Sequence, residues 1–451
     1  MFVKRIAELQ LLEDQYAFEG NNLVLLYGRK GTGKTTLLAE FIKNKAAVYY
    51  YEGTECEDRL QLLRMNQNMT ASSTLANLLD YPVLFSDFIT SHEEKAIIIL
   101  DEFQYIIRNR PDFTEALRVI SNAKRPIMFV LSSSSIRWAE NDMVSDLGTL
   151  AASITAYMKL KEFTFVDFVN RFPKASVETC ININAILGGV PEYLDYWLEG
   201  QSVQENIEKI ILNKNSRLFA ETQQFLRLEL REPAVYNTIL YALAKGNRKL
   251  NDLHAKTGFS RAKISVYLKN LIQLDVVEKL VPLNEEGKEN VQKGLYRIKD
   301  NFLSFWYRFV FDNTSQLMLG RISQVYKEKI APNLEEYMSE YFADVCTEYL
   351  KLMNQYNRLP EKILWWDRWY GKNGTIDINA QGDKDKKLIG KCLWEERKME
   401  VSDYETLIAL AGEAKISPDF TYFFSKKGFT QELTGLAKDN KNIVLVGLED
   451  L

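Results

Sequence analysis

The sequence contains little that could build a metal centre from histidine or cysteine. It has two histidines, His92 and His254, and four cysteines that are far apart and form no C-x-x-C pair. Histidine-based metal sites, zinc knuckles, a disulfide framework and a Ser-His-Asp triad are therefore not expected. No run reaches about eighteen uninterrupted apolar residues, and the first residues lack the apolar core of a signal peptide. We therefore expect a cytoplasmic chain with no membrane partner.

An excess of positive charge is also missing. The chain has 57 Lys and Arg against 61 Asp and Glu, a formal net charge of −4 at pH 7. Any contact with nucleic acid would therefore have to come from a local basic patch. The length of 451 residues and the hydrophobic content of 46% suffice for about two to four packed domains.

The most specific pattern present is a glycine-rich loop between an apolar run and a helical segment. Residues 21–36 read NNLVLLYGRKGTGKTT, and residues 28–35 match the phosphate-binding loop G-x-x-x-x-G-K-[ST] without a mismatch. Glycines let backbone N–H groups point at phosphate oxygens, Lys34 places a charge on the β- and γ-phosphates, and the Thr35 hydroxyl can ligate Mg²⁺. The pattern predicts that ATP and Mg²⁺ are bound by Gly28, Arg29, Lys30, Gly31, Thr32, Gly33, Lys34, Thr35 and Thr36.

A second apolar run ends in two carboxylates, the Walker B pattern. Residues 95–102 read KAIIILDE, and we expect Asp101 to hold the Mg²⁺ shell while Glu102 accepts a proton from, or orients, the attacking water. Alone, such acids can be an ordinary solvated strand end; with the loop, they predict a hydrolysing site. Residues 126–135 predict a strand between the acids and the loop, with Ser134 as candidate γ-phosphate sensor. A serine-rich turn explains these residues nearly as well.

The order of elements predicts an α/β protein. Four apolar runs alternate with helical segments up to about residue 170, which is typical of a parallel sheet covered on both faces. We expect a P-loop ATPase core over residues 1–172, a helical lid over 173–233, a winged helix over 234–310 and a small α/β domain over 311–451.

Residues 250–298 carry the signals of a winged helix. A short helix, a turn at Gly258 and a second helix capped by Ser260 make a helix-turn-helix, with Ile264, Leu268 and Leu271 facing inward. Apolar runs at 276–281 and 295–298, separated by a charged tip, predict the β-hairpin.

This region is also locally basic. Residues 241–300 contain twelve Lys and Arg against seven Asp and Glu. Arg261, Lys263 and Lys269 would project from the second helix, where DNA readers place their contacts. Winged helices also serve as protein-interaction or packing modules, so double-stranded DNA and a protein partner or self-association both stay open.

Taken together, these motifs resemble a known family. Phe2-Val-Lys-Arg5, the phosphate loop, residues 100–105, the Gly188-Gly-Val-Pro191 segment and residues 296–307 are similar to the archaeal-type ATPases of prokaryotes. These resemble AAA-related signal-transduction NTPases and carry a winged helix and a C-terminal domain similar to PD-(D/E)xK nucleases. The resemblance implies that Pro191 approaches the nucleotide base and that Arg5 lies near the nucleotide. A plain helix start and a surface arginine are the alternatives.

Two departures from the family pattern bear on activity. Residues 151–162 lack the Gly-Arg-Arg stretch of relatives, so the candidate arginine finger, worth about 10³–10⁵ in rate, is missing and only Arg137 offers a substitute. In the C-terminal domain, the family's metal-site positions fall on Ala343, Asp377, Lys391 and Leu393. One carboxylate beside a lysine would oppose Mg²⁺ binding. The resemblance therefore implies a nuclease-like fold without nuclease activity.

These observations favour a slow, Mg²⁺-dependent ATPase that acts as a nucleotide-controlled switch for a DNA- or partner-binding winged helix. A non-catalytic interaction scaffold stabilised by ATP is the first alternative. An ATP-dependent nuclease is a weaker one.

Overall fold

The computed structural model describes residues 5–70, 79–110, 113–118, 125–280 and 294–451. The chain divides into two compact units. The first contains residues 1–163 together with 190–192, and the second contains residues 164–189 and 193–451. The predicted domain boundaries at residues 172, 233 and 310 stay predictions.

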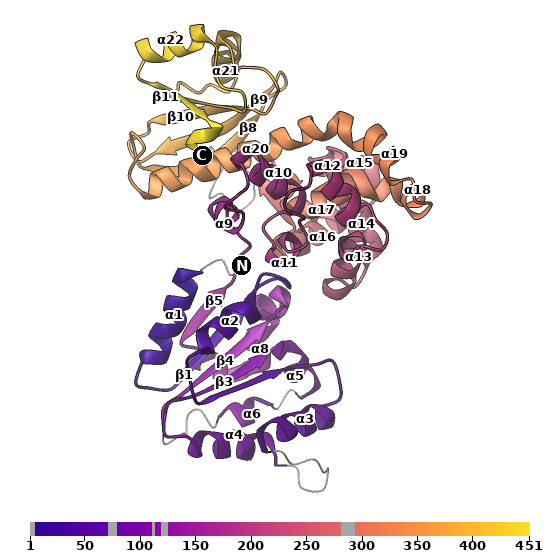
Figure 1. Cartoon of the computed structure of the whole chain (residues 1–451), viewed down its shortest axis with the longest axis vertical. Helices are drawn as coiled ribbons and strands as arrows, with labels where there is room; N and C mark the ends of the chain where they lie inside the picture. Colours follow the sequence, from indigo (N-terminus) through magenta and orange to yellow (C-terminus); the bar gives the residue numbers. More distant parts are fainter. Residues whose placement is uncertain (1–4, 71–78, 111–112, 119–124, 281–293) are drawn as a thin grey trace. The chain divides into compact units, whose positions relative to one another are not determined.

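The first unit contains a five-stranded parallel sheet, as the alternating sequence predicted (Figure 1). Its strand order is β2-β3-β4-β1-β5. Strand β4 therefore lies between β1, which leads into the glycine-rich loop, and β3, which carries the two acids. The strands are β1 (Asn22–Tyr27), β2 (Val48–Glu52), β3 (Ala96–Asp101), β4 (Ile127–Ser133) and β5 (Ala156–Lys159).

Strand β5 was not among the strands expected from the sequence. It has only four residues, lies at the edge of the sheet beside β1, and exposes 55% of Tyr157. A short, half-exposed edge strand gives no continuous apolar run, which is the signal that identified the other four strands.

Alternate residues of the buried strands divide between two apolar cores. Leu23 and Leu25 of β1 belong to one core, and Val24 and Leu26 belong to the other. Helices cover both faces, as parallel sheets require. The first core includes residues of α3 (Asp58–Thr70), α4 (Tyr81–Thr90), α5 (Phe103–Asn109), α6 (Phe113–Leu117) and α8 (Met143–Leu147), and the second includes residues of α1 (Ile6–Ala17) and α2 (Lys34–Ile42).

The second unit begins with helices, as expected after residue 172. Tyr337, in the long helix α20, is buried and donates its hydroxyl hydrogen to the Ala185 carbonyl in α10 (3.0 Å). The helices of this part are α9 (Phe165–Arg171), α10 (Val177–Leu187), α11 (Pro191–Leu194, which begins in the first unit), α12 (Val203–Asn206), α13 (Arg217–Glu229), α14 (Pro233–Ala244), α17 (Asn301–Phe305), α18 (Thr314–Met318), α19 (Ile322–Val325) and α20 (Ala331–Gln355).

The winged helix is confirmed. Helix α15 (Leu250–Thr257) ends at Gly258, whose φ is 73°, and α16 (Arg261–Gln273) begins after Ser260, whose hydroxyl accepts from the Lys263 N–H. The three residues predicted to face inward from α16 are at most 1% exposed. Strands β6 (Val277–Leu280) and β7 (Leu295–Ile298) pair antiparallel. Most of the predicted charged tip lies at 281–293, outside the described residues.

A separate five-stranded sheet forms the C-terminal part, as the apolar runs predicted (Figure 1). Its order is β12-β11-β10-β9-β8, antiparallel from β8 to β10 and parallel from β10 to β12. Helix α20 packs against β9 and β10. The remaining elements are β8 (Ile363–Tyr370), β9 (Thr375–Gly382), β10 (Lys387–Leu393), α21 (Val401–Glu413), β11 (Phe420–Ser425), α22 (Gln431–Asp439) and β12 (Ile443–Gly447).

Within the described ranges, no helix combines the length and apolar character needed to cross a bilayer.

Candidate functional site

The glycine-rich loop joins the buried end of β1 to the first turn of α2. Gly31 and Gly33 adopt φ values of 83° and 91°, a left-handed backbone that glycine reaches without strain. An added Cβ on Gly28 would lie 2.4 Å from the Leu160 carbonyl oxygen. The loop is therefore held close to neighbouring backbone, and its curl depends on glycine at these positions.

The loop lysine and threonine have different partners. The Lys34 side chain is 5% exposed, and its amino group donates to the carbonyl oxygens of Gly28 (2.8 Å) and Arg29 (3.2 Å). The Thr35 hydroxyl donates to Oδ2 of Asp101, 2.9 Å away. The fold thus brings together the hydroxyl and the carboxylate predicted to hold Mg²⁺. Both groups offer the hard oxygen ligands that this ion prefers.

Glu102 follows β3 in a left-handed conformation with φ of 50°, which is uncommon for a residue other than glycine. Its carboxylate accepts from the Ser134 hydroxyl and from the Gln104 side-chain amide. Gln104 also donates to Ser134 (3.1 Å) and accepts from Ser133 (2.7 Å). The two predicted residues Glu102 and Ser134 are therefore directly bonded, within a polar chain that includes Gln104.

Tyr50 is a residue of this site that the sequence did not single out. Its hydroxyl donates to Oδ2 of Asp101 at 2.6 Å. Burial raises the pKa of the Tyr50 hydroxyl, and its hydrogen bond to Asp101 raises this pKa further. The phenol therefore stays protonated at physiological pH. Because Glu102 donates its backbone N–H to Oδ1 of Asp101 (2.9 Å), both oxygens of this carboxylate have fixed partners.

Arg5 and the segment after Gly188 also reach the loop. Arg5 donates to the carbonyl oxygens of Thr32 (3.1 Å) and Lys161 (2.8 Å). Pro191 is the first residue of α11, and the next residue, Glu192, donates its backbone N–H to the Gly31 carbonyl (3.2 Å). These contacts place Arg5 and Pro191 near the loop; the predicted contact of Pro191 with the nucleotide base stays a prediction.

Arg137 is the one substitute for an arginine finger that the sequence offered. Arg137 is about half exposed and forms an ion pair with Asp142 at 3.9 Å. Arg29 is 6% exposed and pairs with Glu162 at 3.3 Å.

The three cations predicted to contact nucleic acid are exposed on α16. Arg261 donates to the Asn251 side chain at 2.8 Å. The Lys263 ammonium lies 4.7 Å from the centre of the Phe259 ring. These contacts leave the charges at the surface, where a polyanion can reach them.

The four positions that the family resemblance predicts to match a nuclease metal site lie around one pocket of the second unit. It is lined by Ala343 of α20, Asp377 of β9, and Lys391 and Leu393 of β10. Lys391 forms an ion pair with Asp377 at 3.4 Å. No group of three or more His, Cys, Asp or Glu side chains that could hold a metal ion occurs in the part of the chain that the structure describes.

Some of these contacts had no signal in the sequence. Tyr50 lies within the run Tyr49-Tyr50-Tyr51. Side chains alternate along a strand, so Tyr50 points to the opposite face of the sheet from its two neighbours. The sequence does not say which of the two faces lies near the acids. Gln104 follows the acids by two residues, but only the turn at Glu102 directs it towards Ser134 and Ser133.

Comparisons with known families cover most of the chain. Residues 2–196 match a family described as an ATPase domain predominantly from Archaea. Residues 237–279 match the helix-turn-helix of bacterial regulatory proteins of the arsR family. Residues 306–404 match archaeal and bacterial proteins of unknown function.

Two similar proteins come from the archaeon Methanocaldococcus jannaschii. One, an uncharacterized protein, is 30% identical over 409 residues, which is 88% of each chain. The other, an uncharacterized ATP-binding protein, is 47% identical over 45 residues, 10% of this chain and 76% of the relative.

Solved structures show a more distant likeness. The ORC2 protein of Aeropyrum pernix, in complexes with ADPNP and ADP, has a TM-score of 0.45 at 13% identity, covering 71% of this chain and 96% of that one. A signal transduction ATPase with a tetratricopeptide repeat sensor, from Pyrococcus horikoshii, has a TM-score of 0.28 at 14% identity, covering 79% and 51%. At these scores neither likeness decides a function.

Proposed function

We propose that this chain, which belongs to the family of ATPases found predominantly in Archaea, hydrolyses ATP slowly with Mg²⁺ and uses its nucleotide state to control a DNA-binding winged helix. The observation that carries this proposal is the cluster of Thr35, Asp101 and Glu102. A hydroxyl from the loop and a carboxylate from β3 share a hydrogen bond of 2.9 Å. The second acid lies next to them on its own polar chain.

Each group in the cluster has a distinct role in this proposal. The backbone of residues 28–36 and Lys34 bind the phosphates, while Thr35 and Asp101 orient the magnesium shell. Glu102 takes a proton from the attacking water or orients it. Ser134 and Gln104 hydrogen-bond to the Glu102 carboxylate, so these contacts control whether the carboxylate can accept a proton from the water. Bound ATP supplies the phosphoanhydride bond, and Mg²⁺ neutralises charge on its phosphates.

The expected rate is low. An arginine that stabilises the transition state is worth about 10³–10⁵ in rate, and Arg137 is paired with Asp142 at the surface. The lack of a candidate arginine finger favours the alternative function, an interaction scaffold that binds ATP without hydrolysing it. Measured turnover, with and without duplex DNA, separates the two functions.

Two substitutions test the assignment of the site. Lys34→Ala should abolish ATP binding, because it removes a ground-state phosphate contact. Glu102→Gln should keep ATP binding and lower hydrolysis by about a hundredfold or more, because it removes only an acid–base role. The matched control is Glu93→Gln, an exposed residue, which should leave both unchanged. Hydrolysis at the parental rate by Glu102→Gln would refute the role given to this residue.

The switch is tested by retention of duplex DNA at low salt with ATP, with ADP and without nucleotide. We expect affinity to differ between the ATP and ADP forms, and to lose its dependence on nucleotide in Lys34→Ala. Equal retention in all three states would refute the switch. If duplex DNA is not retained in any nucleotide state, the winged helix would instead bind a protein partner.

A further inference from the structure

The pocket around Asp377 and Lys391 has a volume of about 430 Å³, within the range of about 300–1,000 Å³ typical of small-molecule sites. It lies wholly within the second unit, and its lining comes from α20, from β8 to β10, from the segment after β10, from α21 and from Arg248 before α15. Its basic side chains are Arg248, Arg368, Lys391 and Arg397, and the lining contains the same number of carboxylates. The formal charges cancel, so the hydrogen-bonding groups left without partners decide what the pocket can bind.

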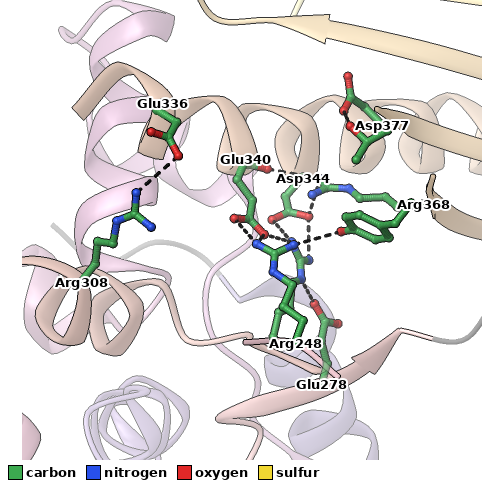
Figure 2. Close-up of polar contacts among 11 residues, drawn as sticks. Arg248, Glu278, Arg308, Glu336, Glu340, Asp344, Arg368 and Asp377 are labelled. Carbon is green, nitrogen blue, oxygen red and sulfur yellow. Dashed lines mark hydrogen bonds and ion pairs between the residues drawn. The ribbon is translucent and has the colours of Figure 1, made fainter. Parts of the chain in front are cut away.

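The carboxylates on the α20 side have strong partners. Both oxygens of Glu340 accept from Arg248 at 2.7 Å, and Oδ1 of Asp344 accepts from Arg368 at 2.9 Å (Figure 2). Asp344, behind the pocket wall, also receives two hydrogen bonds from Arg297, at 2.8 and 3.0 Å. These acids are therefore neutralised within the protein.

The other three carboxylates of the lining have partners as well. Glu395 accepts from Nε of Arg397 at 2.7 Å. Asp403 accepts from Arg397 through both oxygens, at 2.7 and 2.8 Å. Asp377 accepts from the Cys392 backbone N–H at 2.9 Å and from the Thr375 hydroxyl at 3.3 Å. Added cations would therefore have to displace existing donors.

Two of the cations, by contrast, keep unused donors. In the described residues, the only polar contact of the Lys391 ammonium is its 3.4 Å ion pair with Asp377, which is too long for a strong hydrogen bond. Arg368 uses only Nη2, which donates to Asp344 and to the Glu340 carbonyl (3.2 Å). Its Nε and Nη1 groups make no hydrogen bond with the described residues, although the side chain is only 11% exposed.

Buried N–H donors without a partner in this pocket favour a ligand with oxygen acceptors. We propose that this pocket binds a small oxyanion, the phosphate or carboxylate group of a small molecule, through Lys391 and Arg368. The unused Nε–H and Nη1–H groups of Arg368 can each donate to an oxygen of an oxyanion, and the Lys391 ammonium adds a compact charge. The replacement of a metal ligand by Lys391 thus creates an anion site where the family pattern has a cation site.

The site also contacts the winged helix directly. Arg248 lines the pocket, and its carbonyl accepts from the Tyr296 N–H of β7 at 2.8 Å. A ligand on Lys391 and Arg368 would therefore lie beside a residue that belongs to the winged helix.

The experiment uses the full chain carrying Lys34→Ala, so that phosphate binding by the nucleotide loop does not contribute. Titration calorimetry with inorganic phosphate and, separately, with succinate should show saturable binding of at least one probe. Adding Lys391→Ala should weaken that binding by about ten- to a hundredfold, the loss expected for a hydrogen bond to a charged group. The control is Lys387→Ala on the same strand, which does not line the pocket and should leave binding unchanged.

The two probes identify the source of the oxyanion: binding of phosphate alone indicates a phosphorylated ligand, and binding of succinate alone indicates a carboxylate. Arg368→Lys, which keeps the charge but removes the Nε–H and Nη1–H donors, should weaken binding, and the thermal midpoint reports whether the fold is kept. Binding that persists in Lys391→Ala at the same affinity would overturn the proposal. So would the failure of both probes to bind.

Discussion

Tyr50 and Thr35 donate their hydroxyl hydrogens to the same oxygen, Oδ2 of Asp101, at 2.6 and 2.9 Å. The two donors come from β2 and α2, and they hold the carboxylate from two sides. Thr35 is also the predicted magnesium ligand, so Tyr50 is the donor to this oxygen that has no predicted role in binding the ion.

This relationship predicts that Tyr50 positions Asp101 for magnesium. In Tyr50→Phe the carboxylate loses one charge-assisted hydrogen bond, worth about 1.5–3 kcal/mol. We expect the Mg²⁺ concentration for half-maximal hydrolysis to rise by about tenfold or more, with a smaller change in metal-free nucleotide affinity. A magnesium titration of ATPase activity measures the first, and equilibrium binding in EDTA measures the second.

The matched control is Tyr49→Phe. Tyr49 is 6% exposed, and among the described residues its hydroxyl contacts only the Met65 carbonyl, at 3.5 Å. It should leave the magnesium dependence unchanged. An unaltered magnesium titration in Tyr50→Phe would show that the hydrogen bond has no role in metal binding.

The exposed cations of α16 predict salt-dependent binding to duplex DNA. If Arg261, Lys263 and Lys269 contact phosphates, each replacement by alanine should lower the slope of log affinity against log salt by about one unit. Fluorescence anisotropy over a salt series measures this slope. The control is Lys438→Ala, an exposed lysine on α22, which should keep the parental slope. Slopes that do not change in the α16 variants would place the contacts elsewhere.

The pairing of Lys391 with Asp377 predicts that the protein will not cut DNA or RNA with Mg²⁺ or Mn²⁺. A single carboxylate beside an ammonium 3.4 Å away cannot hold a strongly hydrated dication and activate water. Incubation with labelled single- and double-stranded substrates, with and without ATP, tests this. Metal-dependent cleavage that Asp377→Ala abolishes would overturn the prediction.

The combined variant Ala343→Glu, Lys391→Glu and Leu393→Lys restores the family's missing groups. It should bind Mn²⁺ more tightly than the parent in a calorimetric titration. Two added carboxylates then join Asp377, and the lysine charge moves from position 391 to position 393.

Asp344 predicts a dependence of stability on pH. Burial raises the pKa of Asp344, but the ion pairs with Arg297 and Arg368 lower it more, so that it lies below its usual range. A depressed carboxyl pKa adds stability at pH values above the unfolded pKa of about 3.9. This stability is lost as the pH falls towards the folded pKa.

Because 34% of the Asp344 side chain is exposed, solvent weakens this contribution relative to a fully buried pair. Asp344→Asn should lower the free energy of unfolding by about 1–2 kcal/mol at pH 7, and the difference from the parent should shrink below about pH 4. Urea unfolding at several pH values measures this, with Asp439→Asn, at the exposed end of α22, as the control. A difference that stays constant with pH would contradict the assigned pKa.

The sequence determined the parts of this protein whose chemistry is local. The loop before α2 needs glycine for left-handed backbone at Gly31 and Gly33. This requirement falls on residues close together in the chain, so the sequence alone shows it. Buried parallel strands such as β3 and β4 require uninterrupted apolar residues, and the cap at Ser260 and the turn at Gly258 mark the helix-turn-helix. Apolar runs also predicted the C-terminal sheet domain, and family resemblance added its likeness to nucleases.

Only the tertiary structure decided which distant side chains meet. Tyr50 reaches Asp101 because β2 lies beside β3 in the sheet, and the alternation along β2 does not say which face of the sheet meets the acids. Lys391 and Arg368 line one pocket because β9 lies between β8 and β10. Their unused donors become visible only when every carboxylate around them has been assigned a partner. Such contacts depend on strand order and register, which a single sequence encodes only through the energy of the whole fold.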